Sequence, residues 1–252
     1  GWLGAERLRA IRFSGGEPTL HADLPRFVRA SKGAGIGRVA VSTNGSAPWR
    51  KYEELLRLGA DDFSVSLDAC CAGDGDAMAG GVRGSWDRTV RTIRRLAALT
   101  YVTVGVVVTE RNVVTASRTI ALAAALGAAD VRVIPAAQSG QALGDLDVAG
   151  AVLERCPVLR YRVGRMRVGL PVRGLVPQDS SRCALALDDM AIMGAEHWPC
   201  IIYMREGGAP IGKVGAGARA DRASWAERHD THADPICRAN CLDVCVAHNN
   251  RV

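Results

Sequence analysis

The sequence predicts an α/β fold built on a parallel sheet, and three observations support this prediction. Short apolar runs rich in β-branched residues recur, with helical stretches between them. Parallel strands have this uninterrupted apolar character because helices cover their sheet. The runs repeat at intervals of roughly thirty residues, which fits successive βα units of a barrel or of an open doubly wound sheet. With 252 residues, 48% of them hydrophobic, the chain is also long enough to bury a large core.

The elements follow from the local patterns. A helix is expected after Ser85, because Trp86, Val90 and Ile93 recur at helical spacing. Gly59 is expected to end the preceding helix. A further strand is expected around Tyr161–Val168, inside a stretch rich in glycine, proline and valine. The five strands of the sheet are expected at Leu8–Phe13, Arg38–Ser42, Phe63–Leu67, Val102–Val108 and Val131–Ile134.

Charge and hydropathy exclude several classes of protein. The net charge is +6, but the 32 basic residues are scattered among 26 acidic ones, so a nucleic-acid partner is not expected. No run approaches the length of a membrane-spanning helix, and no signal-peptide pattern opens the chain. A cytoplasmic protein with no membrane partner is therefore expected.

The cysteines indicate metal binding. Five of the eight lie in the last seventy residues, and three of these follow one another at spacings of four. In a chain without a secretory signal, such clustering indicates a metal or iron–sulfur site before disulfides. Zinc remains an alternative, because His229, His232 and His248 lie nearby, and so do unligated buried thiols. The candidate ligands are Cys183, Cys200, Cys237, Cys241 and Cys245.

The first strand ends in the run Ser14–Thr19, which contains two glycines followed by a glutamate. Glycines at a strand end let the backbone approach a ligand closely, and a carboxylate beside them can accept a hydrogen bond from an ammonium group. The alternative is an ordinary tight turn before a helix. The residues of interest in this run are Gly15, Gly16, Glu17 and Pro18.

The longer run Ile11–Leu20 resembles the "GGEP" segment of radical S-adenosylmethionine (radical SAM) enzymes. Four later segments, at 41–45, 64–68, 104–112 and 131–140, look like the ends of further strands in that family. The resemblance covers about Leu8 to Gly140. It implies a partial (βα)6 TIM-like barrel in which the second to sixth strands of the family are present.

The resemblance also implies a cofactor site. The backbone of Gly15 and Gly16, together with Glu17, would hold the amino group of S-adenosylmethionine. Ser66 and Asp68 would face its carboxylate or ribose, and the main chain at Ile134 and Pro135 would line the adenine. Further candidates are Pro18, Asn112 for the ribose, and Thr43 and Asn44, for which a simple turn is an equal interpretation.

One departure from the family is important. Its three cysteines, spaced Cys-x3-Cys-x2-Cys, precede the "GGEP" strand, and this sequence begins after that position. A fragment of a longer enzyme is therefore expected, with a degenerate relative as the alternative. The chain alone is expected to be inactive without the upstream motif.

The carboxy-terminal cysteines resemble a SPASM or shorter twitch extension, which holds auxiliary [4Fe-4S] clusters in many radical SAM enzymes. Cys183, Gly194, Cys200 and the closing group match this pattern, and five thiols suffice for one cluster. The expected organisation is a radical SAM core at 1–140, a connecting segment at 141–180, and a small cysteine-rich auxiliary-cluster domain at 181–252.

The implied activity is hydrogen abstraction by a 5′-deoxyadenosyl radical, in peptide or protein modification or maturation. The expected partners are a peptide or small-molecule substrate and an electron donor such as flavodoxin or ferredoxin. One alternative is a radical SAM enzyme of small-molecule, nucleotide or cofactor metabolism. Another is a non-catalytic module that binds zinc or an iron–sulfur cluster and recognises a partner.

Overall fold

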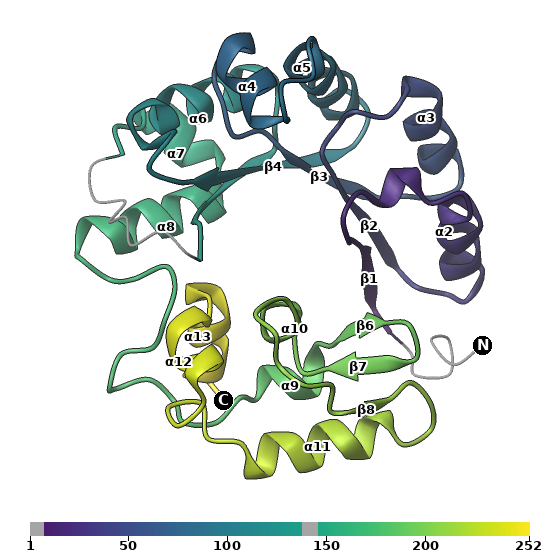
Figure 1. Cartoon of the computed structure of the whole chain (residues 1–252), viewed down its shortest axis with the longest axis vertical. Helices are drawn as coiled ribbons and strands as arrows, with labels where there is room; N and C mark the ends of the chain where they lie inside the picture. Colours follow the sequence, from purple (N-terminus) through teal and green to yellow (C-terminus); the bar gives the residue numbers. More distant parts are fainter. Residues whose placement is uncertain (1–7, 138–145) are drawn as a thin grey trace. The chain divides into compact units, whose positions relative to one another are not determined.

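The computed structural model describes residues 8–137 and 146–252. The chain forms two compact units, Gly1–Val168 and Gly169–Val252 (Figure 1). The expected end of the core at Gly140 lies outside the described residues. Among the residues described, no helix has both the length and the apolar composition needed to cross a bilayer.

The first unit is built on one parallel sheet with strands in the order β1-β2-β3-β4-β5, which confirms the predicted fold class. Each strand lies within two residues of its expected position. Because all five strands run in the same direction, their carboxyl ends meet along one edge. The strands are Ala10–Phe13 (β1), Arg38–Thr43 (β2), Asp62–Ser66 (β3), Tyr101–Val108 (β4) and Asp130–Pro135 (β5).

Helices follow the strands and cover one face of this sheet (Figure 1). The side chains that face them are apolar and fully buried, as shown by Val41, Phe63 and Val104 at 0% exposure. The elements of this unit are η1 (Pro18–Leu20), α2 (Leu24–Gly33), α3 (Trp49–Arg57), α4 (Ala72–Met78), α5 (Ser85–Ala97), η2 (Val113–Thr115), α6 (Ala116–Ala125), α7 (Gly150–Arg155) and α8 (Pro157–Arg167).

The opposite face of the sheet is polar. Adjacent strands pair Ser42 with Ser64, and Ser64 with Thr103. Arginines reach these residues from the outer strands: Arg12 donates to the Ser42 hydroxyl (3.3 Å) and Arg132 to the Ser64 hydroxyl (3.1 Å). Successive side chains of a strand point to opposite faces, so a single sheet carries one apolar and one hydrophilic surface.

The prediction of a strand at Tyr161–Val168 is wrong, because these residues form the second half of helix α8 and its C-cap. Apolar and basic residues alternate here, and a repeat of two residues is the pattern expected of a strand. Pro157 instead begins a helix, a position that Pro favours. Leu159, Val163 and Met166 then lie on one buried face at helical spacing.

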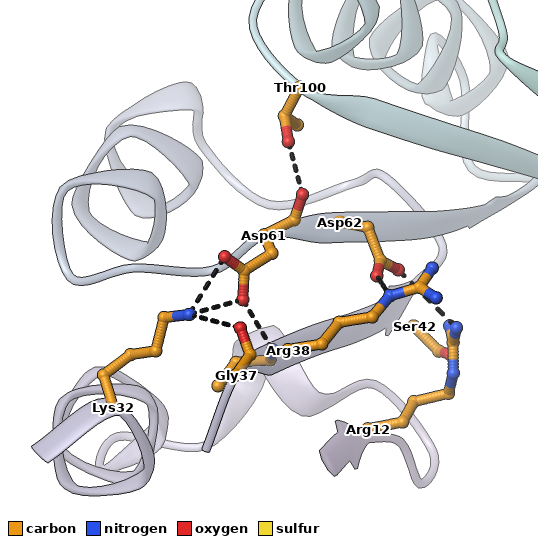
Figure 2. A network of polar contacts seen from close by, with 9 residues as sticks. Arg12, Lys32, Gly37, Arg38, Ser42, Asp61, Asp62 and Thr100 are labelled. Atoms are coloured by element: carbon orange, nitrogen blue, oxygen red, sulfur yellow. Dashed lines mark hydrogen bonds and ion pairs between the residues drawn. The ribbon is translucent and has the colours of Figure 1, made fainter. Parts of the chain in front are cut away.

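Ion pairs tie together the amino ends of the strands (Figure 2). Lys32 donates to both carboxylate oxygens of Asp61 (3.0 and 2.8 Å), which precedes β3. Arg38, the first residue of β2, pairs with Asp62, the first residue of β3. The Arg12 guanidinium lies 3.5 Å from the same Asp62 carboxylate. The network therefore joins β1, β2 and β3 at the end opposite to the candidate site.

The second unit combines a small antiparallel sheet, in the order β6-β7-β8, with short helices. Arg173 pairs with Leu242 in an isolated bridge, and the Gly174 amide donates to the Cys241 carbonyl (2.9 Å). Its elements are α9 (Leu185–Asp188), β6 (Ala191–Met193), β7 (Glu196–Trp198), α10 (Ile201–Arg205), β8 (Gly212–Lys213), α11 (Ala218–Arg228), α12 (Pro235–Asn240) and α13 (Asp243–Asn249).

Candidate active site and thiol cluster

The turn after β1 leaves open space beside its two glycines. A Cβ atom placed on Gly15 or Gly16 would have no atom outside the adjoining residues within 4 Å. Gly15 has a φ of 152°, which L side chains rarely adopt. A ligand can therefore approach the backbone at this turn without meeting a side chain.

Glu17 fastens this turn to the neighbouring strand. Its Oε1 accepts hydrogen bonds from the Thr19 amide (3.1 Å) and the Thr43 hydroxyl (2.7 Å). Its Oε2 accepts from the Asn44 amide (2.6 Å). A carboxylate oxygen has two lone pairs, so Oε2 keeps capacity for one further donor. Pro18 follows in the first turn of η1, for which Glu17 is the N-cap.

Thr43, at the end of β2, is engaged within the protein. Its side chain is buried, and its hydroxyl lies 3.2 Å from the Tyr52 hydroxyl. Burial raises the pKa of Tyr52, so this hydroxyl stays protonated and holds the Thr43–Glu17 contact. Asn44 is exposed instead, and its Oδ1 accepts from the Ser46 amide (2.9 Å).

The ends of β2 and β3 open into a cavity of about 560 Å³, a size suited to a small ligand. Asn44, Ser66 and Asp68 line it from the strand ends, and residues of α4 and α5, including Met78 and Trp86, form the other wall. The structure thus brings together three of the residues predicted from sequence.

The Asp68 carboxylate is held in place by the next strand. Its Oδ1 accepts from the Val107 amide (2.7 Å), and burial raises the pKa of this carboxyl group. Asn112 supports the same corner, because its amide donates to the carbonyl oxygens of Asp68 (2.8 Å) and Val107 (2.9 Å). The Asn112 side chain is therefore engaged with the ends of β3 and β4. Ile134 and Pro135 are the last two residues of β5, which ends one residue beyond the predicted strand.

The sequence did not indicate that α4 forms one wall of this cavity. Gly75 packs so closely on the Trp86 ring that a Cβ would lie 2.3 Å from Cδ1. The indole Nε1 of Trp86 donates to the Ala69 carbonyl (2.9 Å), and Asp76 accepts from the Gly84 and Trp86 amides (2.7 and 2.9 Å). A short helix with two glycines gave no clear signal in the sequence.

The second unit gathers the five predicted thiols. All are half-buried and none forms a disulfide. Burial raises the pKa of each, and negative charge on Cys245, Cys183, Cys237 and Cys200 adds to the effect at Cys241. The Cys245 pKa rises to about 12. Each ionised thiolate disfavours ionisation of the others, and a cation would stabilise the ionised forms.

Local contacts orient several of these sulfur atoms. Cys200 is the N-cap of α10, and its Sγ accepts from the Tyr203 amide (3.3 Å). The Asn249 amide lies 3.8 Å from Cys183 Sγ. Cys237 Sγ lies 3.5 Å from His229 Nε2. Sequence reasoning named His229 but missed Asp234, although an aspartate followed by proline is a recognisable helix start.

Comparison with known proteins finds a family match in the amino-terminal part of the chain. Residues 2–115 match the radical SAM superfamily. The GTP 3′,8-cyclase of Chlorobaculum tepidum is 44% identical over 67 residues, which cover 26% of this chain and 20% of that protein. The GTP 3′,8-cyclase of Synechococcus elongatus is 38% identical over 82 residues, 32% of this chain and 24% of that protein. The chain thus aligns with less than a quarter of the length of these relatives.

Two solved structures share the fold over most of the chain. Streptococcus suis SuiB bound to S-adenosylmethionine has a TM-score of 0.57 at 14% identity, covering 90% of this chain and 59% of SuiB. Native anSMEcpe with bound AdoMet and the Kp18Cys peptide has a TM-score of 0.53 at 11% identity, covering 84% of this chain and 66% of that chain. The sequence match and the shared fold agree with the glycine-rich turn and the parallel sheet described above. The amino-terminal unit is therefore similar to the radical SAM superfamily over residues 2–115, and the fold is similar to those of SuiB and anSMEcpe.

Proposed function

We propose that the chain binds S-adenosylmethionine at the carboxyl-terminal edge of the β1–β5 sheet and works as a radical SAM enzyme on a peptide or protein substrate. The open turn at Gly15 and Gly16, joined by Glu17 to the end of β2, is the observation that carries this proposal. Radical SAM proteins bind S-adenosylmethionine and a [4Fe-4S] cluster, which together supply one-electron chemistry that ends in hydrogen abstraction from the substrate.

The residues of the site fit the cofactor. The open backbone at Gly15 and Gly16 suits the amino group, and Glu17 Oε2 offers the acceptor that an ammonium group needs. Ser66 and Asp68 line the neighbouring cavity, where Asp68 Oδ2 is the carboxylate oxygen not used by the Val107 amide. Such an oxygen can accept a hydrogen bond from a ribose hydroxyl. Asn44, Asn112, Ile134 and Pro135 remain predicted contacts.

Binding of S-adenosylmethionine tests the site directly. We expect Glu17→Gln to weaken binding roughly 10- to 100-fold, because a charge-assisted hydrogen bond is lost. Gly16→Ala should weaken it about tenfold or more without unfolding the chain, since the added methyl has room in the free protein and lies where the ligand approaches. Glu53→Gln, an exposed change in α3, is the matched control and should bind as the wild type does. Unaltered binding by Gly16→Ala in equilibrium dialysis would contradict the proposed site.

We further propose that the thiols of the second unit hold one auxiliary [4Fe-4S] cluster. Zinc bound by several of these thiols fits less well. Tetrahedral Zn–S bonds of about 2.3 Å would place the sulfur atoms about 3.8 Å apart. Among the described residues, no three thiols lie within 4.8 Å of one another. Wider spacing suits the larger core of an iron–sulfur cluster, for which four thiolates are needed.

Anaerobic reconstitution with iron and sulfide tests this assignment. About four iron and four sulfide per chain are expected, because one [4Fe-4S] cluster contains that number. Cys241→Ala should lose the cluster, whereas Cys70→Ala, a thiol of the first unit, should keep it. Uptake of zinc only, with no sulfide, would overturn the assignment.

Two comparisons bear on the substrate. The structural likeness to SuiB and anSMEcpe extends over both units, and the SuiB and anSMEcpe structures include peptide-bound forms. This likeness is in fold alone, so it supports a peptide as the substrate class without defining the sequence acted upon. The GTP 3′,8-cyclase relatives favour a nucleotide as the second candidate, on a match of 67 residues.

The two substrate classes can be separated by product analysis. The protein expressed from its native reading frame, with S-adenosylmethionine and a chemical reductant, should form 5′-deoxyadenosine faster with peptides than with GTP. Stimulation by GTP alone would favour the nucleotide activity and would reject the peptide proposal.

A further inference from the structure

Three potential metal ligands lie together in the second unit, and one of them is a thiol of the cysteine group described above. They are His229, Asp234 and Cys237, whose ligand atoms all lie within 4.8 Å of one another. His229 Nε2 is 3.5 Å from Cys237 Sγ and 3.8 Å from Asp234 Oδ2. All three side chains are half-buried, so the group is neither sealed in the core nor spread over the surface.

These separations match the coordination shell of a single ion. With Zn–N near 2.05 Å and Zn–S near 2.3 Å, a tetrahedral angle separates the nitrogen and sulfur ligands by about 3.5 Å. The corresponding nitrogen–oxygen separation is about 3.4 Å. Only small side-chain shifts would therefore bring the His229, Asp234 and Cys237 ligand atoms to an ion.

The surrounding residues already hold these ligands in position. The His229 ring stacks on Trp225, with centroids 3.9 Å apart and planes at 19°. The Tyr203 hydroxyl lies 3.2 Å from Asp234 Oδ2, and Asp234 Oδ1 accepts from the Cys237 amide (2.9 Å). Metal ligands in proteins are usually oriented by such outer contacts.

We propose that His229, Asp234 and Cys237 bind one divalent transition-metal ion, with zinc as the favoured ion, separately from the iron–sulfur cluster. Nitrogen, sulfur and oxygen ligands together suit zinc, and three protein ligands leave the fourth position to water. The separation of this site from the cluster rests on the auxiliary cluster proposed above. If Cys237 binds zinc, four thiols remain for that cluster: Cys183, Cys200, Cys241 and Cys245. One [4Fe-4S] cluster needs four thiolates.

Metal analysis of the reconstituted chain tests the proposal. After anaerobic reconstitution with iron and sulfide, the chain is dialysed against Zn²⁺ or Co²⁺, and iron, sulfide and the added metal are measured. The wild type should hold one divalent ion beside its cluster, and bound Co²⁺ should show the absorption of a thiolate-ligated tetrahedral ion. Cys237→Ser and His229→Gln should lose this ion and keep the iron.

Two further variants separate ligation from folding. Tyr203→Phe should weaken zinc binding roughly 10- to 100-fold, because outer contacts tune metal affinity by that amount. His232→Gln is the matched control: this histidine lies three residues from His229, contacts the Asp179 carbonyl instead, and should bind zinc as the wild type does. Circular dichroism of every variant verifies that the unit stays folded.

The possible outcomes distinguish this inference from the proposed cluster. Loss of iron in Cys237→Ser, with zinc retained in His229→Gln, would overturn the separate site and leave the cluster in place. A wild type that takes up no iron and sulfide, but binds one zinc ion that His229→Gln abolishes, would remove the cluster and support the separate site. Equal zinc binding in the wild type and His229→Gln would reject the inference.

Discussion

The two units of the chain are stabilised in different ways. In the first, large aliphatic and aromatic side chains such as Phe63, Leu55 and Leu96 are fully buried between the sheet and its helices. In the second, the buried apolar residues are fewer and half of them are alanines (Ala186, Ala191 and Ala218), and they share the interior with polar side chains such as His197. Small domains with little apolar burial commonly depend on metal ions. We therefore expect burial to stabilise the first unit, and the proposed metal ligation by the thiols to stabilise the second.

Metal removal should produce the largest difference between the units. Chelation or oxidation of the metal should cost the second unit on the order of 10 kcal/mol of folding free energy, as in other small metal-stabilised domains. Limited trypsin digestion should then degrade residues 169–252 and leave a resistant fragment that ends near Val168. A second unit that stays resistant without metal would contradict the comparison.

Truncation of the apolar core should affect only the first unit. Phe63→Ala is expected to lower the free energy of unfolding by about 3–5 kcal/mol, because it leaves a cavity at a fully buried position. Leu99→Ala, at a side chain that is 63% exposed, is the control and should change it by about 0.5 kcal/mol or less. Denaturant titration gives the energies, and the iron content per folded chain should stay the same.

The ion pairs at the amino ends of the strands should contribute unequally. Asp62 is buried, with its side chain 5% exposed, so Asp62→Asn should cost about 1.5–3 kcal/mol. Lys32 is 29% exposed and pairs with the more accessible Asp61, so Lys32→Ala should cost less than about 1 kcal/mol. Equal losses in urea titration would show that burial does not set the strength of these pairs.

The smallest expected effect concerns the wall of the cavity. Gly75→Ala should cost about 1–2 kcal/mol, because the new methyl collides with Trp86. Gly73→Ala lies in the same helix with no atom within 4 Å of its Cβ, and should be neutral or stabilise by about 0.4–1 kcal/mol. Thermal unfolding of this pair, combined with S-adenosylmethionine binding, separates packing from ligand effects. If Gly75→Ala unfolds like Gly73→Ala, the close Trp86 contact is not formed.

The strands of the first unit could be predicted because each is a continuous apolar run such as Val102–Val108, and few other structures require that pattern. Helix α8 was misread because glycine and alternating arginines hid its helical face, which only the packing of Leu159 against the core reveals. The strand-end positions of Glu17 and Asp68 followed from the motifs. Their hydrogen-bond partners did not, since Thr43 and Val107 come from other strands and sequence spacing carries no information on such contacts.

The sequence indicates that the cysteines form a group, but it does not indicate which of them has other potential metal ligands beside it. Sequence spacing treats Cys237 and Cys241 alike, whereas folding places His229 and Asp234 beside the first of them. The stacking of Trp225 on His229 likewise depends on how α11 ends, which no local pattern specifies.

The hydrophilic face of the β1–β5 sheet has a consequence for how such a chain can evolve. Fully buried apolar side chains such as Val41 and Phe63 lie on the opposite, helix-covered face, so the less buried Ser42 and Thr103 can be exchanged with little loss of folding free energy. Descendants of one ancestral sheet can thus acquire different polar linings while their strands and helices stay the same. Related proteins can then come to bind different ligands without a change of fold. The core stays recognisable even after most of its sequence has changed.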